Sequence, residues 1–191
     1  MRTTKIFFIS LAVTIFFIQN GSAFDWKEYA PQGSYCSVKM PKKPELCVKK
    51  GVPTDSGPID MYQVLADYGE YAFLLTFNDY PAALLKQKTS KQILDDVVSG
   101  SVGDGELVNK SEISVGTYPG REYTCRKSGM ELKGSIYLVD GRLYQMIVAY
   151  PPNQAGTLAA DRDTFLKSFK LETPAGVTAQ PNDAVYNCAS Q

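Results

Sequence analysis

The chain has 191 residues with 20 basic and 20 acidic side chains, so its formal net charge is zero, and it contains no histidine. The lack of histidine excludes Ser-His and Cys-His catalytic pairs and any metal or haem site that depends on an imidazole ligand. The balanced charge, with no basic cluster, makes nucleic acid a poor candidate partner.

The first 23 residues have the pattern of a removable targeting segment. Arg2 and Lys5 precede an apolar run over residues 6–18, and Gly21-Ser22-Ala23 supplies small residues for cleavage. This run is shorter than the ~20 residues needed to span a bilayer. We therefore predict a signal peptide, cleaved after Ala23, and an exported mature chain that is periplasmic or secreted. Without the two bases, 18 bases and 20 acids remain, for a net charge of −2. No later segment of the sequence is long and apolar enough to cross a membrane.

Four cysteines lie beyond this segment, at Cys36, Cys47, Cys125 and Cys188. An even number of cysteines in an exported chain indicates two disulfides, for which three connectivities are possible. We favour Cys36–Cys47, across a hairpin that turns at Pro41-Lys42-Lys43-Pro44. The second bridge would then be Cys125–Cys188, which would fix the C-terminal tail to the central strands.

Two short strands are predicted at residues 35–40 and 46–52, on either side of that turn. Residues 51–58 contain two prolines and two glycines and should form a loop. Residues 59–66 and 71–77 alternate strongly and predict a second hairpin.

Two helices are predicted. Thr89 or Ser90 could cap a helix that runs to Ser99 and ends at Gly100. One stripe of this helix is apolar and should be buried, with the residues Ile93, Leu94, Val97 and Val98. Residues 158–167 predict a second helix, with Phe165 and Leu166 facing inward.

The strongest strand signal surrounds the turn Val139-Asp140-Gly141-Arg142. Asp-Gly suits a type I′ turn, because both central residues need a positive φ. The resulting register places Leu138 opposite Leu143 and Tyr137 opposite Tyr144. Side chains on both faces of this hairpin are apolar, so we expect two central strands that are covered on both sides.

Residues 121–126 can pair back onto this hairpin through Ser128-Gly129, which gives a three-stranded meander. A weaker strand is predicted at residues 106–115. The order of hairpin, helix, meander and helix predicts an α+β fold, an antiparallel β-sheet with helices packed on both faces. We expect residues 24–171 to form a single domain and residues 172–191 to form an irregular tail.

Several short motifs also point to a known fold. They are Cys36-Ser37-Val38-Lys39-Met40-Pro41, Gly116-Thr117-Tyr118-Pro119-Gly120-Arg121-Glu122, Tyr137-Leu138, Gly141-Arg142-Leu143-Tyr144 and Phe165-Leu166-Lys167-Ser168-Phe169-Lys170-Leu171. Together they resemble exported proteins of the Mog1/PsbP-like fold, over roughly residues 35–171. The resemblance implies an antiparallel sheet flanked by helices. Members include a partner of a nuclear transport GTPase and an extrinsic photosystem subunit, so no single function is implied.

Carboxylates are the remaining candidates for catalysis or metal binding. Asp95 and Asp96 are adjacent on a helix and point in different directions. Asp161 and Asp163 lie near a helix start, where acids suit the helix dipole. Both pairs are interpreted as solvated or capping charges. Asp104 and Glu106 flank a glycine and could hold a cation weakly, but no calcium-loop motif surrounds them. We predict no cofactor and no metal.

The sharpest motif is Tyr118-Pro119-Gly120-Arg121-Glu122. Its structural interpretation is a Pro-Gly turn that leads into a strand. Its functional interpretation is a partner-binding patch of Tyr118, Arg121 and Arg142, because tyrosine and arginine are common interface anchors.

We therefore predict a non-catalytic exported protein that binds an unknown extracytoplasmic protein. The alternative is a carrier of a small apolar ligand or lipid, in a pocket between the sheet and a helix near Leu84, Leu85, Tyr144 or Met146. A carboxylate-based hydrolase is a third hypothesis, and it would need two carboxyl groups that converge in one cleft.

Overall fold

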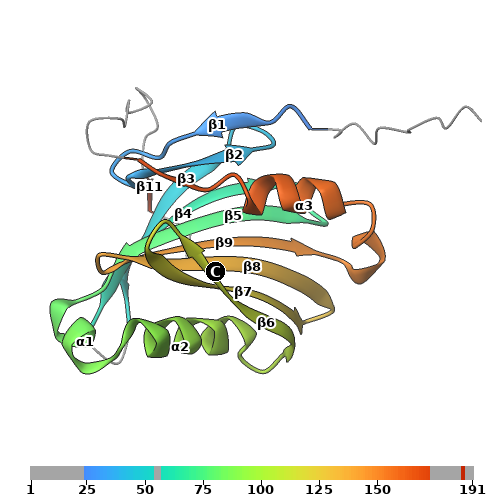
Figure 1. The fold of residues 1–191 in the computed structure, drawn as a ribbon. Helices are drawn as coiled ribbons and strands as arrows, with labels where there is room; N and C mark the ends of the chain where they lie inside the picture. Colours follow the sequence, from blue (N-terminus) through green and yellow to red (C-terminus); the bar gives the residue numbers. More distant parts are fainter. Residues whose placement is uncertain (1–23, 54–56, 173–185, 188–191) are drawn as a thin grey trace, which may run out of the picture.

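The computed structural model describes residues 24–53, 57–172 and 186–187 (Figure 1). The predicted signal peptide and most of the predicted tail lie outside these residues. The elements, in chain order, are β1 (Lys27–Tyr29), β2 (Cys36–Met40), β3 (Glu45–Val52), β4 (Ile59–Asp67), β5 (Ala72–Asp79), α1 (Ala82–Gln87), α2 (Ser90–Val102), β6 (Glu106–Val115), β7 (Tyr118–Lys127), β8 (Met130–Val139), β9 (Arg142–Tyr150), the short 3-10 turn η1 (Pro152–Gln154), α3 (Ala159–Leu166), β10 (Lys170–Leu171) and β11 (Tyr186–Asn187).

The strands form two sheets. The main sheet has eight strands in the order β11-β3-β4-β5-β9-β8-β7-β6, and the small sheet has the order β1-β2-β10. Within the described residues, neighbouring strands run antiparallel except for β11, which runs parallel to β3. Strands account for 51% of the structure and helices for 21%.

The predicted α+β architecture, in which helices alone cover both faces of one sheet, is wrong, because a second β-sheet covers one face together with α3. One face of the main sheet is covered by the small sheet together with α3 (Figure 1). The main core lies between the two sheets, where Val38 and Met40 of β2 meet Phe73 and Val148 of the main sheet, each at most 1% exposed. Four of the five residues of β2 are buried, so it fills this core directly and leaves α3 only part of the face. The fold is therefore mostly antiparallel β-sheet.

The predicted hairpin between residues 35–40 and 46–52 is also wrong. Strand β2 pairs with β1 and β10, whereas β3 pairs with β4. The chain thus crosses from the small sheet to the main sheet at the Pro41–Pro44 segment instead of folding back on itself. Proline there breaks both strands, and a break is compatible with a crossover as well as with a turn.

The central meander has the predicted register. Leu138 lies opposite Leu143 and Tyr137 lies opposite Tyr144, and the turn residues Asp140 and Gly141 have φ values of 48° and 89°. Positive φ at both positions is what a type I′ turn requires.

Helix α2 covers part of the other face, over β7 and β8. Its buried side chains form a second core with Tyr123, Cys125, Ile136, Leu138 and Leu143, and they are Ile93, Leu94, Val98 and Val102. The helix continues past the predicted stop at Gly100, because Val102 is buried in this core and the chain turns only at Gly103, whose φ is 56°.

The predicted cap of α2 is confirmed at Thr89. Its hydroxyl accepts from the Gln92 N–H, and the Gln92 side chain accepts from the Thr89 N–H at 2.8 Å, which completes a capping box. We expect Thr89→Ala to lower the free energy of unfolding by about 1 kcal/mol. Thr89→Ser keeps the hydroxyl and should stay close to the unmodified protein in the same urea titration. Equal stability of the alanine variant and the unmodified protein would show that the cap contributes nothing.

Candidate partner-binding surface

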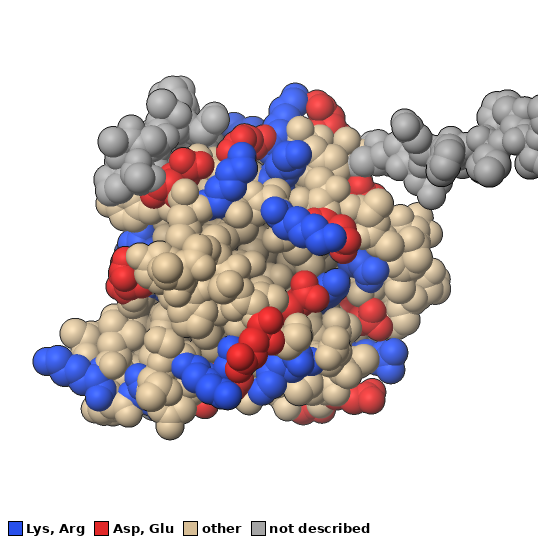
Figure 2. Space-filling view, viewed as in Figure 1, with Lys and Arg blue, Asp and Glu red and all other residues tan. Residues whose placement is uncertain are grey.

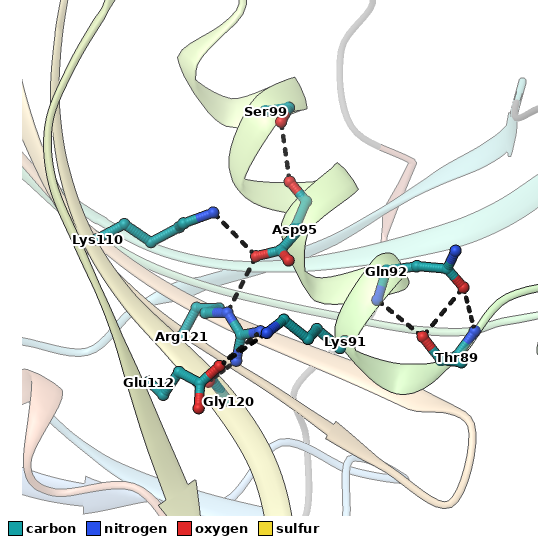
Figure 3. Close-up of polar contacts among 9 residues, drawn as sticks. All are labelled: Thr89, Lys91, Gln92, Asp95, Ser99, Lys110, Glu112, Gly120 and Arg121. Atoms are coloured by element: carbon teal, nitrogen blue, oxygen red, sulfur yellow. Dashed lines mark hydrogen bonds and ion pairs between the residues drawn. The ribbon is translucent and has the colours of Figure 1, made fainter.

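Arg121 is buried beneath α2 (Figure 3). Its Nε lies 3.0 Å from Asp95 Oδ1, and a terminal nitrogen lies 3.4 Å from Glu112 Oε1. Lys110 Nζ also lies 3.0 Å from Asp95 Oδ1. Arg121 and Lys110 together hold the pKa of the Asp95 carboxyl below its usual value. The Arg121 side chain is only 5% exposed and links α2 to β6 and β7. Its charge is therefore paired with acidic side chains of the same chain and is not presented at the surface.

Arg142 begins β9 and makes a bidentate ion pair. Its Nε lies 2.6 Å from Asp79 Oδ1, and its Nη2 lies 2.7 Å from Asp79 Oδ2. The remaining Nη1 donates to the carbonyl of Gly33 at 2.6 Å. The guanidinium also lies 5.1 Å from the ring centre of Tyr35 and 5.9 Å from that of Phe77. Arg142 thereby joins the ends of two strands to the loop that precedes β2.

Tyr118 lies close to the Asp140-Gly141 turn, which directly precedes Arg142. Its hydroxyl donates to Asp140 Oδ2 at 2.8 Å, and this hydrogen bond raises the pKa of the Tyr118 phenol. Asp140 is two residues before Arg142. The structure thus places Tyr118 and Arg142 at one end of the sheet. Arg121 is directed to the α2 face instead, so the three predicted residues do not form one patch.

Sequence reasoning missed Tyr35, which is 43% exposed and has a φ of 56°. A bulky residue with a positive φ is a genuine outlier and persists only where its surroundings hold it. Here the preceding Ser34 is buried, and the carbonyl of Ser34 accepts from the hydroxyl of Tyr144 at 2.6 Å. No pattern in the sequence marks this conformation.

Leu85, which is predicted from the sequence to lie near an apolar pocket, lies at the surface and is 36% exposed. It packs on the central turn, because a Cβ built on Gly141 would lie 2.7 Å from Leu85 Cδ1. We use the name Arg142 patch for the surface that these contacts join, which consists of Tyr35, Asp79, Leu85, Tyr118, Asp140 and Arg142. Its apolar and charged groups share one end of the main sheet.

Acidification should remove the stability that the Arg142–Asp79 ion pair contributes. The hydrogen bonds from Arg142 hold the pKa of Asp79 below its usual value. A depressed folded-state pKa gives stability that is present above the unfolded pKa of about 4 and is lost as the pH falls through the folded value. Asp79 is 66% exposed, so solvent screening limits the effect to about 0.5–1 kcal/mol. We expect Asp79→Asn to be less stable than the unmodified protein near pH 6 and to converge with it near pH 2. A constant difference between the two across a denaturation series in that range would contradict this assignment.

Four of the other acidic candidates are engaged with bases, and Asp161 is buried and 7% exposed. Asp96 pairs with Lys88, Asp104 with Lys127, Glu106 with Arg126 and Asp163 with Lys167. Within residues 24–53 and 57–172, no three histidine, cysteine or acidic side chains are grouped as a metal site would need. Basic and acidic groups are interspersed over the face seen in Figure 2.

The residues predicted to line an apolar pocket do not share one. Tyr144 and Met146 are 2% and 0% exposed within the main core, whereas Leu85 lies on the surface. The described helices include none that is long and apolar enough to cross a membrane.

Cys36 and Cys125 are free, buried thiols, so both predicted disulfides are wrong. Burial in the core raises the pKa of Cys36 to about 12. Cys36 lies opposite Leu171 in the small sheet and Cys47 lies opposite Gln63 in the main sheet, so the two positions are not cross-strand neighbours. Cys188 lies outside the described residues.

Two sheets joined by one aromatic core, with a capped helix on the far side, can be compared with solved structures. The solution structure of cyanobacterial PsbP (CyanoP) from Synechocystis sp. PCC 6803 matches with a TM-score of 0.53 and 16% identity, over 80% of this chain and 95% of that one. The chain has a PsbP-like fold. This result confirms the likeness to PsbP-like proteins that the sequence motifs indicated, whereas the expected layers of helices on both faces were wrong.

Two further solved structures match with lower TM-scores. The crystal structure of LpqN, involved in cell envelope biogenesis of Mycobacterium tuberculosis, has a TM-score of 0.47 and 10% identity, over 78% of this chain and 92% of that one. A protein of unknown function from Pseudomonas aeruginosa, PA94, described as a putative regulator, has a TM-score of 0.40 and 8% identity, over 72% of this chain and 91% of that one. No family model matches the sequence, and no curated protein is similar to it.

Proposed function

We propose that this chain is an exported, non-catalytic protein that binds an extracytoplasmic protein through the Arg142 patch. The observation that carries the proposal is Tyr35, an exposed aromatic ring in a backbone conformation that its surroundings impose. Strained residues with positive φ concentrate at ligand clamps and functional sites.

The chemistry of the patch suits protein recognition. Tyrosine and arginine are enriched among residues that dominate binding energy, especially where neighbouring contacts exclude water. Arg142 is fixed by Asp79 and Gly33 before any partner arrives, and it holds the Tyr35 ring in turn. A side chain that is already ordered loses less conformational entropy on binding, which favours affinity.

Catalysis has less support than binding. The chain has no histidine, and the acidic candidates Asp95, Asp104 and Asp163 are paired with lysine or arginine. A general acid or base needs a pKa near the working pH, whereas arginine lowers the pKa of Asp95 and lysine lowers that of Asp163.

Cysteine pairing is a second part of the proposal, because disulfides persist in oxidising compartments. Cys47 is disulfide-bonded, and Cys36 and Cys125 are free. Strand β11 runs parallel to β3 with Tyr186 opposite Cys47, and Cys188 follows β11 directly. We propose that Cys47 pairs with Cys188. Peptide mapping without reductant should find these two residues joined and the other two as thiols. A bridge to Cys36 or Cys125 would contradict the proposal.

The patch can be tested with variants of Tyr35 and Arg142 and with a control residue as exposed as Tyr35. Tyr35→Ala and Arg142→Ala should each lower the amount of partner retained on the immobilised mature protein by about tenfold or more. Leu107→Ala is the control, because Leu107 is also 43% exposed but lies at the opposite end of the sheet. Urea titrations of all variants would show that they are folded. Partner recovery that is equal for the patch and control variants would place the binding surface elsewhere.

A further inference from the structure

Strand β6 forms an open edge of the main sheet. The opposite edge strand, β3, is paired with β11, whereas within the described residues no strand lies on the outer side of β6 (Figure 1). The strand is ten residues long, and its first seven residues are exposed. Leu107 and Val108, which are 43% and 44% exposed, belong to it. A long edge strand offers backbone N–H and C=O groups to another strand.

We propose that β6 pairs antiparallel with β6 of a second copy of this chain, centred on Ser111. In that register Lys110 of each copy lies opposite Glu112 of the other, which gives two symmetric ion pairs. Both side chains point to the α2 face, since Lys110 reaches Asp95 at 3.0 Å and Glu112 reaches Arg121 at 3.4 Å. A two-fold axis perpendicular to the sheet keeps that face common to both copies, so the opposed charges meet on one side.

The backbone fits the same register. Neighbouring residues of a strand direct their hydrogen-bonding groups to alternate sides. Opposed residues such as Lys110 and Glu112, or Asn109 and Ile113, are an even number of positions apart. Both members of every pair therefore direct their N–H and C=O groups outward together, or inward together, as a continuous antiparallel ladder needs.

The charges of Lys110 and Glu112 also indicate which strand can pair with the open edge of β6. Charged side chains and bulges normally protect an edge from pairing, and β6 has both, with a bulge between Leu107 and Asn109. A strand with an acid opposite Lys110 and a base opposite Glu112 gains two ion pairs, and a second β6 meets that condition. Glu112 already pairs with Lys91 and Arg121, but it is 72% exposed, so it can accept a further cation. One pair of strands buries little surface, so the dimer should be weak and concentration-dependent.

Cross-linking at the centre tests the register directly. In the proposed dimer the two Ser111 residues face each other with Cα atoms about 4.5–5.5 Å apart, within reach of a disulfide. The two Ser114 residues are displaced by six positions, about 20 Å. We expect Ser111→Cys to form a covalent dimer of the full mature chain on mild oxidation and Ser114→Cys to remain monomeric. Absence of the Ser111→Cys dimer, or equal dimer from both variants, would overturn the proposal.

Charge reversal gives an independent measurement. Lys110→Glu should weaken the dimer about tenfold in sedimentation equilibrium, because two attractive pairs become repulsive. Adding Glu112→Lys restores both pairs between the copies, although the carboxylate introduced at position 110 still lies beside that of Asp95. Recovery of the original affinity in the double variant supports the register. A double variant as weak as the single one, or an unmodified chain that stays monomeric at all concentrations, would contradict it.

Discussion

Replacing Gly120 with alanine should lower the free energy of unfolding by about 3 kcal/mol. A Cβ at this position would lie 2.4 Å from the carbonyl oxygen of Ile136 and 2.6 Å from Cδ1 of Tyr137. Tyr137 lies opposite Gly120 and is stacked on Phe169, with ring centres 5.1 Å apart. Neither the backbone oxygen nor the packed ring can move without disturbing the sheet.

Gly100→Ala is the matched control, and its expected effect has the opposite sign. Gly100 lies inside α2 with no atom within 4 Å of a Cβ built there. Alanine should therefore raise the free energy of unfolding by about 0.5–1 kcal/mol, through its higher helix propensity. Chemical denaturation of the two variants separates a steric need for glycine from a general effect of the substitution. Destabilisation by Gly100→Ala, or none by Gly120→Ala, would contradict the packing described above.

Alkaline pH should destabilise the protein strongly. Burial raises the pKa of Tyr144 to about 12, and burial with the hydrogen bond to Glu131 raises the pKa of Tyr150 to about 12. The unfolded phenols lose their protons near pH 10 while the folded ones keep them, so stability falls as the pH rises from about 10 to 12. Each tyrosine should contribute a loss of about 2–3 kcal/mol over that interval.

Phenylalanine variants test this assignment. Tyr144→Phe removes the hydrogen bond to the Ser34 carbonyl, so it should be about 1 kcal/mol less stable near neutral pH. It also removes the titrating group, so its stability should decline less steeply above pH 10. The two stability curves should therefore approach each other or cross in alkaline solution. Parallel curves for the variant and the unmodified protein would show that Tyr144 does not titrate with the predicted linkage.

Local signals predicted the parts of the fold that depend on neighbouring residues. The Asp140-Gly141 turn specified its own conformation and hence the register of β8 and β9. Thr89 and Gln92 specified the start of α2 in the same way. Pairing of β2 with β10 joins Cys36 to Leu171, which are far apart in the sequence, and no local pattern encodes it. The predicted architecture and the predicted disulfide pairs were wrong for that reason.

The candidate site was predicted only in part. Tyr118 and Arg142 were named from residue type, and they do lie at one end of the sheet. Residue type could not show that Arg121 is buried against Asp95, because the burial depends on where α2 packs. Tyr35 could not be found at all, since its exposure and its positive φ come from a loop held by distant Tyr144.

A photoreactive aromatic residue, p-benzoylphenylalanine, in place of Tyr35 would test the binding surface most directly. The mature protein that carries it would be irradiated in an extract of the exported proteins of its host, beside the same probe in place of Leu107. We expect a discrete adduct with another protein from position 35, and from position 107 at most an adduct with a second copy of this chain. The same adducts from both positions, or none from position 35, would contradict the Arg142 patch as the site of partner binding.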